Sequence, residues 1–182
     1  MTGKDAAGRL PGNPMMWILI GSEIAVFGAA LIGFAGARIV NPDIFSAGQS
    51  TLNKTAGALN TAVLLTSGLF AALAVEWRKE QRRSQARLAL LISGLLGCIF
   101  AAVKIAEYKV KLDIGISIET NTFFTLYFLM TGFHLMHVLA GIIIIALVAW
   151  QDSIDNLETG AAFWHMVDMI WVLIFPVIYI VG

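Results

Sequence analysis

Charged residues and cysteine are scarce in this sequence. Asp, Glu, Lys and Arg make up only 13% of its 182 residues, against about 25% in an ordinary soluble domain. The twelve basic and twelve acidic residues cancel, so the chain lacks the excess positive charge that nucleic acid binding requires. The single cysteine, Cys98, excludes a disulfide scaffold and a metal site made of several cysteines.

Apolar residues instead make up 58% of the chain, more than a soluble domain of this length can bury in one core. A transmembrane helix requires about 20 mostly apolar residues. The sequence contains five such runs, at 15–37, 56–75, 88–108, 123–150 and 161–182. We therefore predict an all-α integral membrane bundle of five transmembrane helices, forming a single domain over residues 1–182.

The placement of lysine and arginine predicts the orientation of the chain in the membrane. The N-terminal tail and the connection after the second run lie on one side and carry seven basic residues: Lys4, Arg9, Arg78, Lys79, Arg82, Arg83 and Arg87. The other side carries five: Arg38, Lys54, Lys104, Lys109 and Lys111. We expect a cytoplasmic N-terminus and a periplasmic C-terminus.

Glu23 is an ionisable residue about 12 Å into the first predicted helix, where charged groups are costly and usually functional. Small residues recur at every fourth position of this helix, at Gly21, Ala25, Ala29, Gly33 and Ala37. Such a stripe allows close approach of another helix, and Glu23 points roughly 160° away from it. Glu23 therefore faces a cleft, a partner helix or lipid, either as a hydrogen-bonded structural group or as a proton-handling one.

The three histidines belong to the last two predicted helices. His134 and His137 share one face of the fourth helix, and His165 shares a face of the fifth with Asp168. His134 and His137 are expected near mid-membrane and His165 near the inner edge, an offset of roughly 10–15 Å. One metal ion cannot bridge this offset, so we expect no metal bound by this chain and assign these residues to structural hydrogen bonding.

The third run ends with closely spaced charges. Glu107 can pair with Lys104 three residues before it and with Lys111 four residues after it. Because a lysine near the membrane edge can extend its ammonium outward, we predict a stabilising pair at the surface. Trp164, at the start of the last run, is interpreted as an interface anchor. Pro176 removes one amide hydrogen bond and predicts a kink in the last helix.

The residues along the chain, taken in order, resemble subunit III of the haem-copper oxidases, which include cytochrome c and quinol oxidases. The resemblance extends from about Pro11 to Tyr179. The matching segments are Ser22-Glu23, 59–61, 64–67, Glu107-Tyr108, Phe123-Phe124, 131–134 with His137 and Gly141, 158–161, 164–168 and Trp171.

This resemblance implies a bundle with a V-shaped, lipid-filled cleft, packed beside a catalytic membrane subunit that carries haem and copper or iron. Subunit III holds no redox centre in this family. The resemblance therefore implies an accessory role, in which the chain stabilises the catalytic subunit, supports its proton-coupled turnover and binds phospholipid. The family's membrane-buried glutamate near the lipid cleft corresponds to Glu23.

Three segments resemble one branch of the family in particular: Arg9-Leu10-Pro11-Gly12, Lys104-x-x-Glu107-Tyr108, and 164–168 with Phe175-Pro176. That branch is the short subunit-III-like protein that accompanies nitric oxide reductase in denitrifying bacteria. The resemblance favours this partner, in the bacterial inner membrane, over an oxygen-reducing terminal oxidase of aerobic respiration. The alternatives are a small proton-coupled transporter using Glu23, His165 and Asp168, and a transient assembly factor.

Overall fold

The computed structural model describes residues 14–151 and 153–181. Every regular element in those ranges is a helix: α1 (Pro14–Val40), α2 (Pro42–Ser50), α3 (Lys54–Lys79), α4 (Arg83–Asp113), α5 (Thr122–Gln151), α6 (Ile154–Phe175) and a short π-helix, η1 (Pro176–Ile180). In this part of the chain, five helical spans are long and apolar enough to cross a membrane: α1, α3, α4, α5 and α6 with η1. The prediction of an all-α bundle with five spans is confirmed.

Asparagine side chains cap two of the long helices. The Asn53 side-chain oxygen accepts a hydrogen bond from the backbone N–H of Ala56 at 2.9 Å, at the start of α3. Asn121 accepts in the same way from Phe124 at 3.0 Å, at the start of α5. Such caps satisfy backbone donors that the first helical turn leaves unpaired.

The helices extend beyond the predicted runs at several ends, and the two main differences are an earlier start of α6 and an additional helix. The segment 151–160 was expected to be a connection, but α6 begins at Ile154. Its first turns are polar, so a search for apolar runs does not find them, although the helix includes them. The nine-residue helix α2 was not predicted; Pro42 opens it at a position where the missing N–H costs nothing.

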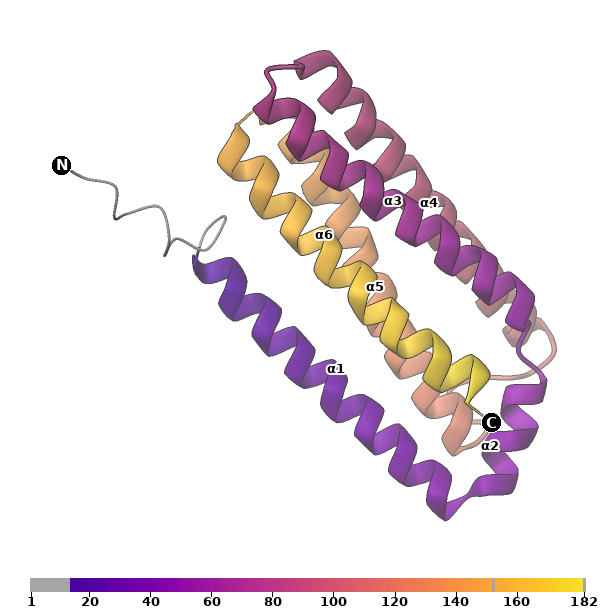
Figure 1. Cartoon of the computed structure of the whole chain (residues 1–182). Coiled ribbons are helices and arrows are strands. Elements are labelled where there is room, and N and C mark those ends of the chain that lie inside the picture. The colour runs from indigo at the N-terminus through magenta and orange to yellow at the C-terminus, as the bar shows by residue number, and fades with distance from the viewer. Residues whose placement is uncertain (1–13, 152, 182) are drawn as a thin grey trace.

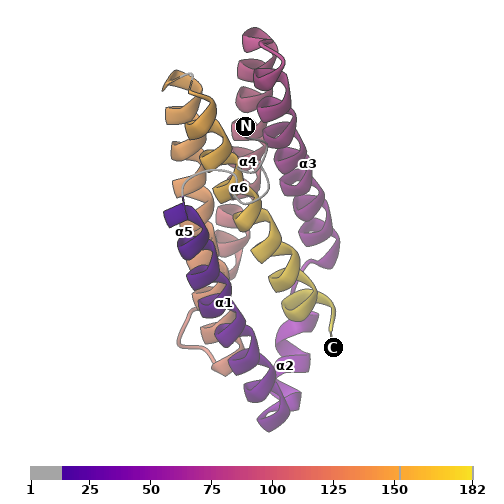
Figure 2. The ribbon, with the colours of Figure 1, turned by 60° about the vertical axis from the view of Figure 1, so that its left-hand side comes forward.

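Helix α6 lies at the centre of the bundle and packs against α1, α3 and α5. Figures 1 and 2 show α3 and α4 as an antiparallel pair on one side of α6, with α1 on the other. Helix α2 lies near the C-terminus, across the end of the bundle. This arrangement brings side chains from α4, α5 and η1 together at one end, and side chains from α1, α3 and α6 together at the other.

Trp164 is fully buried, so its interpretation as an interface anchor was wrong. Two glycines make room for its indole. A Cβ at Gly97 on α4 would lie 2.7 Å from the ring, and a Cβ at Gly141 on α5 would lie 2.6 Å from it. The indole N–H donates to the hydroxyl of Ser67 on α3 at 3.0 Å. Trp164 therefore joins three helices in the core.

The stripe of small residues on α1 is exposed from Gly21 to Gly33, and only Ala37 at its end packs against the core. A Cβ at Gly21 or at Gly33 would find no atom within 4 Å. Helix α1 packs on the bundle through larger side chains instead, among them the buried Phe27 and Phe34. The close helix approach that the stripe allows is therefore not made among the described residues.

The α-helical geometry of α6 ends at Pro176, where η1 begins. A π-helix is wider than an α-helix, and the break occurs at the proline that predicted a kink. Gln49 on α2 stabilises the segment from outside, because its side-chain N–H donates to the carbonyls of Ile178 and Val181, at 2.9 Å each.

Candidate functional site

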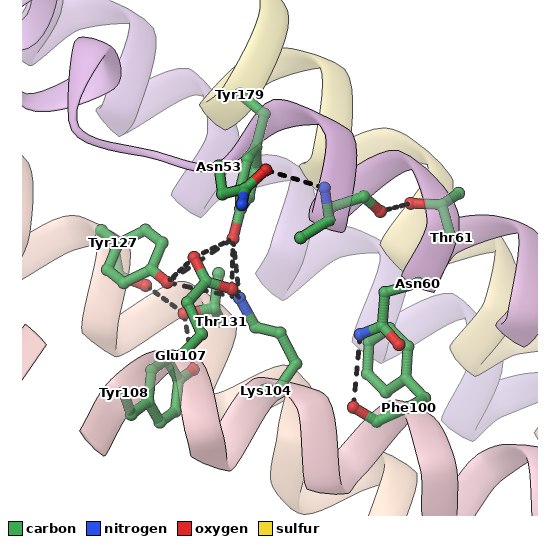
Figure 3. Close-up of polar contacts among 12 residues, drawn as sticks. Asn53, Asn60, Thr61, Phe100, Lys104, Glu107, Tyr108, Tyr127, Thr131 and Tyr179 are labelled. Atoms are coloured by element: carbon green, nitrogen blue, oxygen red, sulfur yellow. Dashed lines mark hydrogen bonds and ion pairs between the residues drawn. The ribbon is translucent and has the colours of Figure 1, made fainter. Parts of the chain in front are cut away.

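Lys104 lies inside the bundle and is only 2% exposed. Its ammonium group donates to Glu107 at 3.0 Å, to the hydroxyl of Tyr127 at 3.3 Å and to that of Tyr179 at 2.7 Å, as Figure 3 shows. These four residues are called the Lys104 cluster below. Every N–H of the ammonium has an acceptor. The predicted pair of Lys104 and Glu107 forms, but its expected location at the surface was wrong.

Glu107 accepts hydrogen bonds from the other members of the Lys104 cluster. Its Oε1 lies 2.9 Å from the hydroxyl of Tyr127 and 2.9 Å from that of Tyr179. Each tyrosine hydroxyl therefore accepts from the ammonium and donates to the carboxylate. Lys111 lies over the rings of Phe124 and Tyr127 instead, at 5.7 Å from each centroid.

Aromatic rings surround the Lys104 ammonium. The centroids of Tyr108, Tyr127, Trp171 and Tyr179 lie 5.3, 5.2, 5.1 and 5.3 Å from it. Ring faces attract a cation most strongly where water is excluded. The positive charge of Lys104 is balanced by Glu107, and every N–H of the ammonium is hydrogen-bonded. The geometry of the cluster therefore suits a structural role, in which it holds α4, α5 and η1 together.

Glu23 on α1 faces His137 on α5, with 3.2 Å between the carboxyl Oε2 and the ring Nε2. The other ring nitrogen, Nδ1, lies 2.8 Å from the carbonyl of Phe133. A carbonyl only accepts, so Nδ1 carries a hydrogen. The carboxyl Oε2 of Glu23 has no hydrogen bond to a described residue, so the two groups are close neighbours by distance alone. Of the surroundings expected for Glu23, the structure therefore shows a partner helix.

His134 is fully buried and has no hydrogen bond to any described residue at either ring nitrogen. Its ring stacks on Trp171 with 5.0 Å between centroids, and Phe100 packs edge-on against it at 5.9 Å. Trp171 lies six residues after His165, which is about 9 Å along the helix axis. His134 and His165 thus lie at different levels, and His134 packs as an aromatic ring.

His165 and Asp168 lie together on α6, with 3.5 Å between Nδ1 and Oδ2. The side chain of Asp168 is only 7% exposed, whereas that of His165 is 44% exposed. The second carboxyl oxygen of Asp168 has no hydrogen bond to a described residue. A Cβ at position 68 of α3 would lie 2.0 Å from Oδ2, so Gly68 makes room for the carboxyl group.

His165 also lines a cavity of about 430 Å³ between α1, α3 and α6. The other lining residues are Trp17, Ile20, Ala72, Val75, Lys79, Glu158, Ala161, Ala162, Met166 and Met169. Lys79 and Glu158 form an ion pair at 2.7 Å. The sequence identified His165 and Asp168 as neighbours, but it gave no sign of the cavity, because α1 and α3 are far from α6 along the chain.

Across residues 14–151 and 153–181, no three His, Cys, Asp or Glu side chains lie close enough to hold one metal ion.

The candidate residues from the sequence lie in separate places in the structure. Lys104 and Glu107 belong to the Lys104 cluster, Glu23 pairs with His137, His165 pairs with Asp168, and His134 lies apart from these pairs. Tyr127 and Tyr179 were missed, since a tyrosine in an apolar helix resembles any other core aromatic. Arg9-Leu10-Pro11-Gly12 lies outside the described residues.

Comparison with known proteins gives a consistent result. A family model described as cytochrome c oxidase subunit III matches residues 16–182. A haem-copper oxidase subunit I+III of Aeropyrum pernix is 27% identical over 91% of this chain and 22% of its own length. Cytochrome c oxidase subunit 3 of Thermostichus vulcanus is 32% identical, over 67% of this chain and 64% of the relative. The corresponding protein of Struthio camelus is 33% identical, over 66% of this chain and 48% of the relative. The chain spans less than two thirds of each of these relatives.

Proposed function

Because this chain belongs to the cytochrome c oxidase subunit III family, we propose that it is an accessory, non-redox subunit of a bacterial haem-copper respiratory complex. In this role it stabilises the catalytic subunit and supports its proton-coupled turnover. The family match over residues 16–182 carries the proposal. The Aeropyrum pernix relative supports it further, since its name joins subunits I and III in one protein.

The exposed stripe on α1 supports contact with a second membrane subunit. Gly21 and Gly33 have open space where a Cβ would be, so another helix can approach the backbone of α1 closely. We propose that haem and copper or iron reside in that partner. The test is purification in mild detergent. The chain should co-elute with a haem-bearing subunit and show no haem absorbance alone; stoichiometric iron or copper in the isolated chain would contradict the proposal.

For the partner's reaction, we propose nitric oxide reduction in denitrification, in preference to oxygen reduction by a terminal oxidase. The resemblance of Lys104, Glu107 and 164–168 to the nitric oxide reductase branch supports this choice. The purified complex should consume nitric oxide with an electron donor present. Consumption of oxygen without consumption of nitric oxide would assign the chain to a terminal oxidase.

For the membrane arrangement, we propose the bacterial inner membrane with the N-terminus in the cytoplasm. Five basic residues in and around the turn between α3 and α4 support this orientation. A single cysteine introduced at Ser84 in a Cys98→Ala background should react with a membrane-impermeant thiol reagent only in inverted vesicles. Reaction in right-side-out vesicles would reverse the orientation.

For Glu23, we propose a proton-handling role at the edge of the bundle, with phospholipid covering the apolar surface beside it. The short distance between the Glu23 carboxyl and the His137 imidazole, 3.2 Å from Oε2 to Nε2, supports this role. Exposed apolar residues of α1, such as Ile24 and Ile32, support the lipid contact. Phospholipid should be retained by the detergent-purified complex at a fixed ratio; a complex stripped of lipid that keeps its full activity and lifetime would contradict a role for it.

A further inference from the structure

The cavity between α1, α3 and α6 is lined mostly by apolar residues, with a few polar side chains among them. Two of these, Lys79 and Glu158, form an ion pair at 2.7 Å and so neutralise one another. The cavity therefore offers no spare cation to an anionic headgroup such as phosphate. A volume of about 430 Å³ lies within the range of small-molecule sites. Its charge balance favours a neutral ligand.

His165 is the polar group that such a ligand meets. It lies two helical turns beyond Glu158, about 10 Å along α6. Its Nδ1 faces Asp168 at 3.5 Å, which leaves Nε2 for a ligand. Asp168 is more than nine-tenths buried, and one of its carboxyl oxygens has no hydrogen bond to a described residue. A fixed buried acid behind an accessible imidazole orients the ring, as carboxylates do for functional histidines.

The imidazole of His165 is neutral in two arrangements, which differ in the position of its hydrogen and by one proton on Asp168. With hydrogen on Nδ1, the ring donates to the carboxylate and Nε2 accepts from a ligand hydroxyl. With hydrogen on the carboxyl group, Nδ1 accepts from it and Nε2–H donates to a ligand carbonyl. The same site therefore fits a ring that carries carbonyl oxygens in one form and hydroxyls in another.

We propose that this cavity binds the ring headgroup of a membrane quinone or quinol, with an oxygen of the ring hydrogen-bonded to Nε2 of His165. The headgroup is neutral, which matches the balanced charge of the cavity. Its apolar tail remains in the bilayer. The inference concerns binding alone, and it rests on this chain's cavity and not on the partner assigned above.

The test uses the full-length chain labelled with ¹⁵N-histidine, in nanodiscs of phosphatidylcholine. The chain has three histidines, so single substitutions assign every imidazole signal. Addition of decylubiquinone should shift the His165 signals in a saturable way and leave those of His134 and His137 unchanged. Ala72→Phe, which fills the cavity from α3, should weaken this binding at least tenfold. Ala58→Phe places the same ring on the exposed surface of the same helix outside the cavity and should leave binding unchanged.

The inference would be overturned if the His165 signals stayed unmoved or if all three histidines shifted together without saturation. It would also be overturned if the Ala72→Phe variant bound decylubiquinone as tightly as the unaltered chain does. An equal shift of His165 on addition of phosphatidylglycerol would identify a lipid site instead. The unchanged signals of His134 and His137 report that each variant is folded. None of these outcomes depends on whether the chain co-purifies with a haem-bearing subunit, so the two proposals fail independently.

Discussion

Gly68 on α3 and Asp168 on α6 fit together so closely that a Cβ at position 68 would lie 2.0 Å from Oδ2 of the carboxyl group. The glycine is therefore required by a contact between two helices rather than by an unusual backbone angle. It allows a carboxyl group to lie at a helix crossing, where His165 is its neighbour at 3.5 Å. The polar pair beside the cavity depends on this absence of a side chain.

Gly68→Ala should destabilise the chain. The methyl group must displace Asp168 from a packed site, and overpacking of this kind typically costs about 1–3 kcal/mol. Thermal unfolding in detergent measures the effect. Gly36→Ala on α1 is the matched control, since a Cβ there meets no atom within 4 Å; it should be neutral or stabilising by up to about 1 kcal/mol. Equal effects of the two substitutions would contradict the contact.

Removal of His165 should cost more stability than removal of Asp168. The side chain of Asp168 is buried, whereas that of His165 is partly exposed. His165→Ala leaves the buried carboxyl group without its neighbour, at a cost of about 1–3 kcal/mol. Melting temperatures of the two variants decide the order, and a larger loss for Asp168→Ala would contradict it.

Single substitutions in the Lys104 cluster should be severe. Glu107→Gln leaves a buried ammonium without its counter-charge, and breaking a buried ion pair in this way costs about 3–5 kcal/mol. The double variant Lys104→Met with Glu107→Leu should cost less than the sum of the single changes. A double-mutant cycle on detergent-solubilised protein measures the coupling, and strict additivity would show that the two charges do not interact.

His134 should tolerate an apolar replacement. It has no hydrogen bond to a described residue and packs on Trp171 as an aromatic ring. Replacement of an unpaired buried polar group by an apolar one of similar shape is close to neutral, so His134→Phe should change the melting temperature little. A loss as large as that of Glu107→Gln would reveal a polar partner for the imidazole.

Glu23→Gln should leave assembly with the partner subunit intact, because an uncharged amide of the same shape can replace the carboxyl group that lies 3.2 Å from Nε2 of His137. It should alter the rate of turnover or shorten the active lifetime of the complex, since an amide cannot take up or release a proton. Turnover assays on the reconstituted complex test this, with the neighbouring Ser22→Ala as control. Unchanged rate and lifetime would reduce Glu23 to a structural residue.

Sequence patterns were informative for contacts along one helix and weak for contacts between helices. The spacing of Lys104 and Glu107, and that of His165 and Asp168, predicted pairs that the structure contains. The same spacing gave no direction for the Lys104 side chain. That direction is set by Tyr179, which lies 75 residues away along the chain.

The amino-acid sequence was enough to predict a bundle of five membrane-crossing helices of the subunit III family. Hydrocarbon satisfies no backbone hydrogen bonds, so each long apolar run must form a helix whatever its neighbours are. The positions of Lys104 inside the bundle, of His137 opposite Glu23 and of His165 beside a cavity became visible in the folded structure alone. Those facts depend on how each helix is rotated and packed against the others, and many rotations bury a nearly uniform apolar surface equally well.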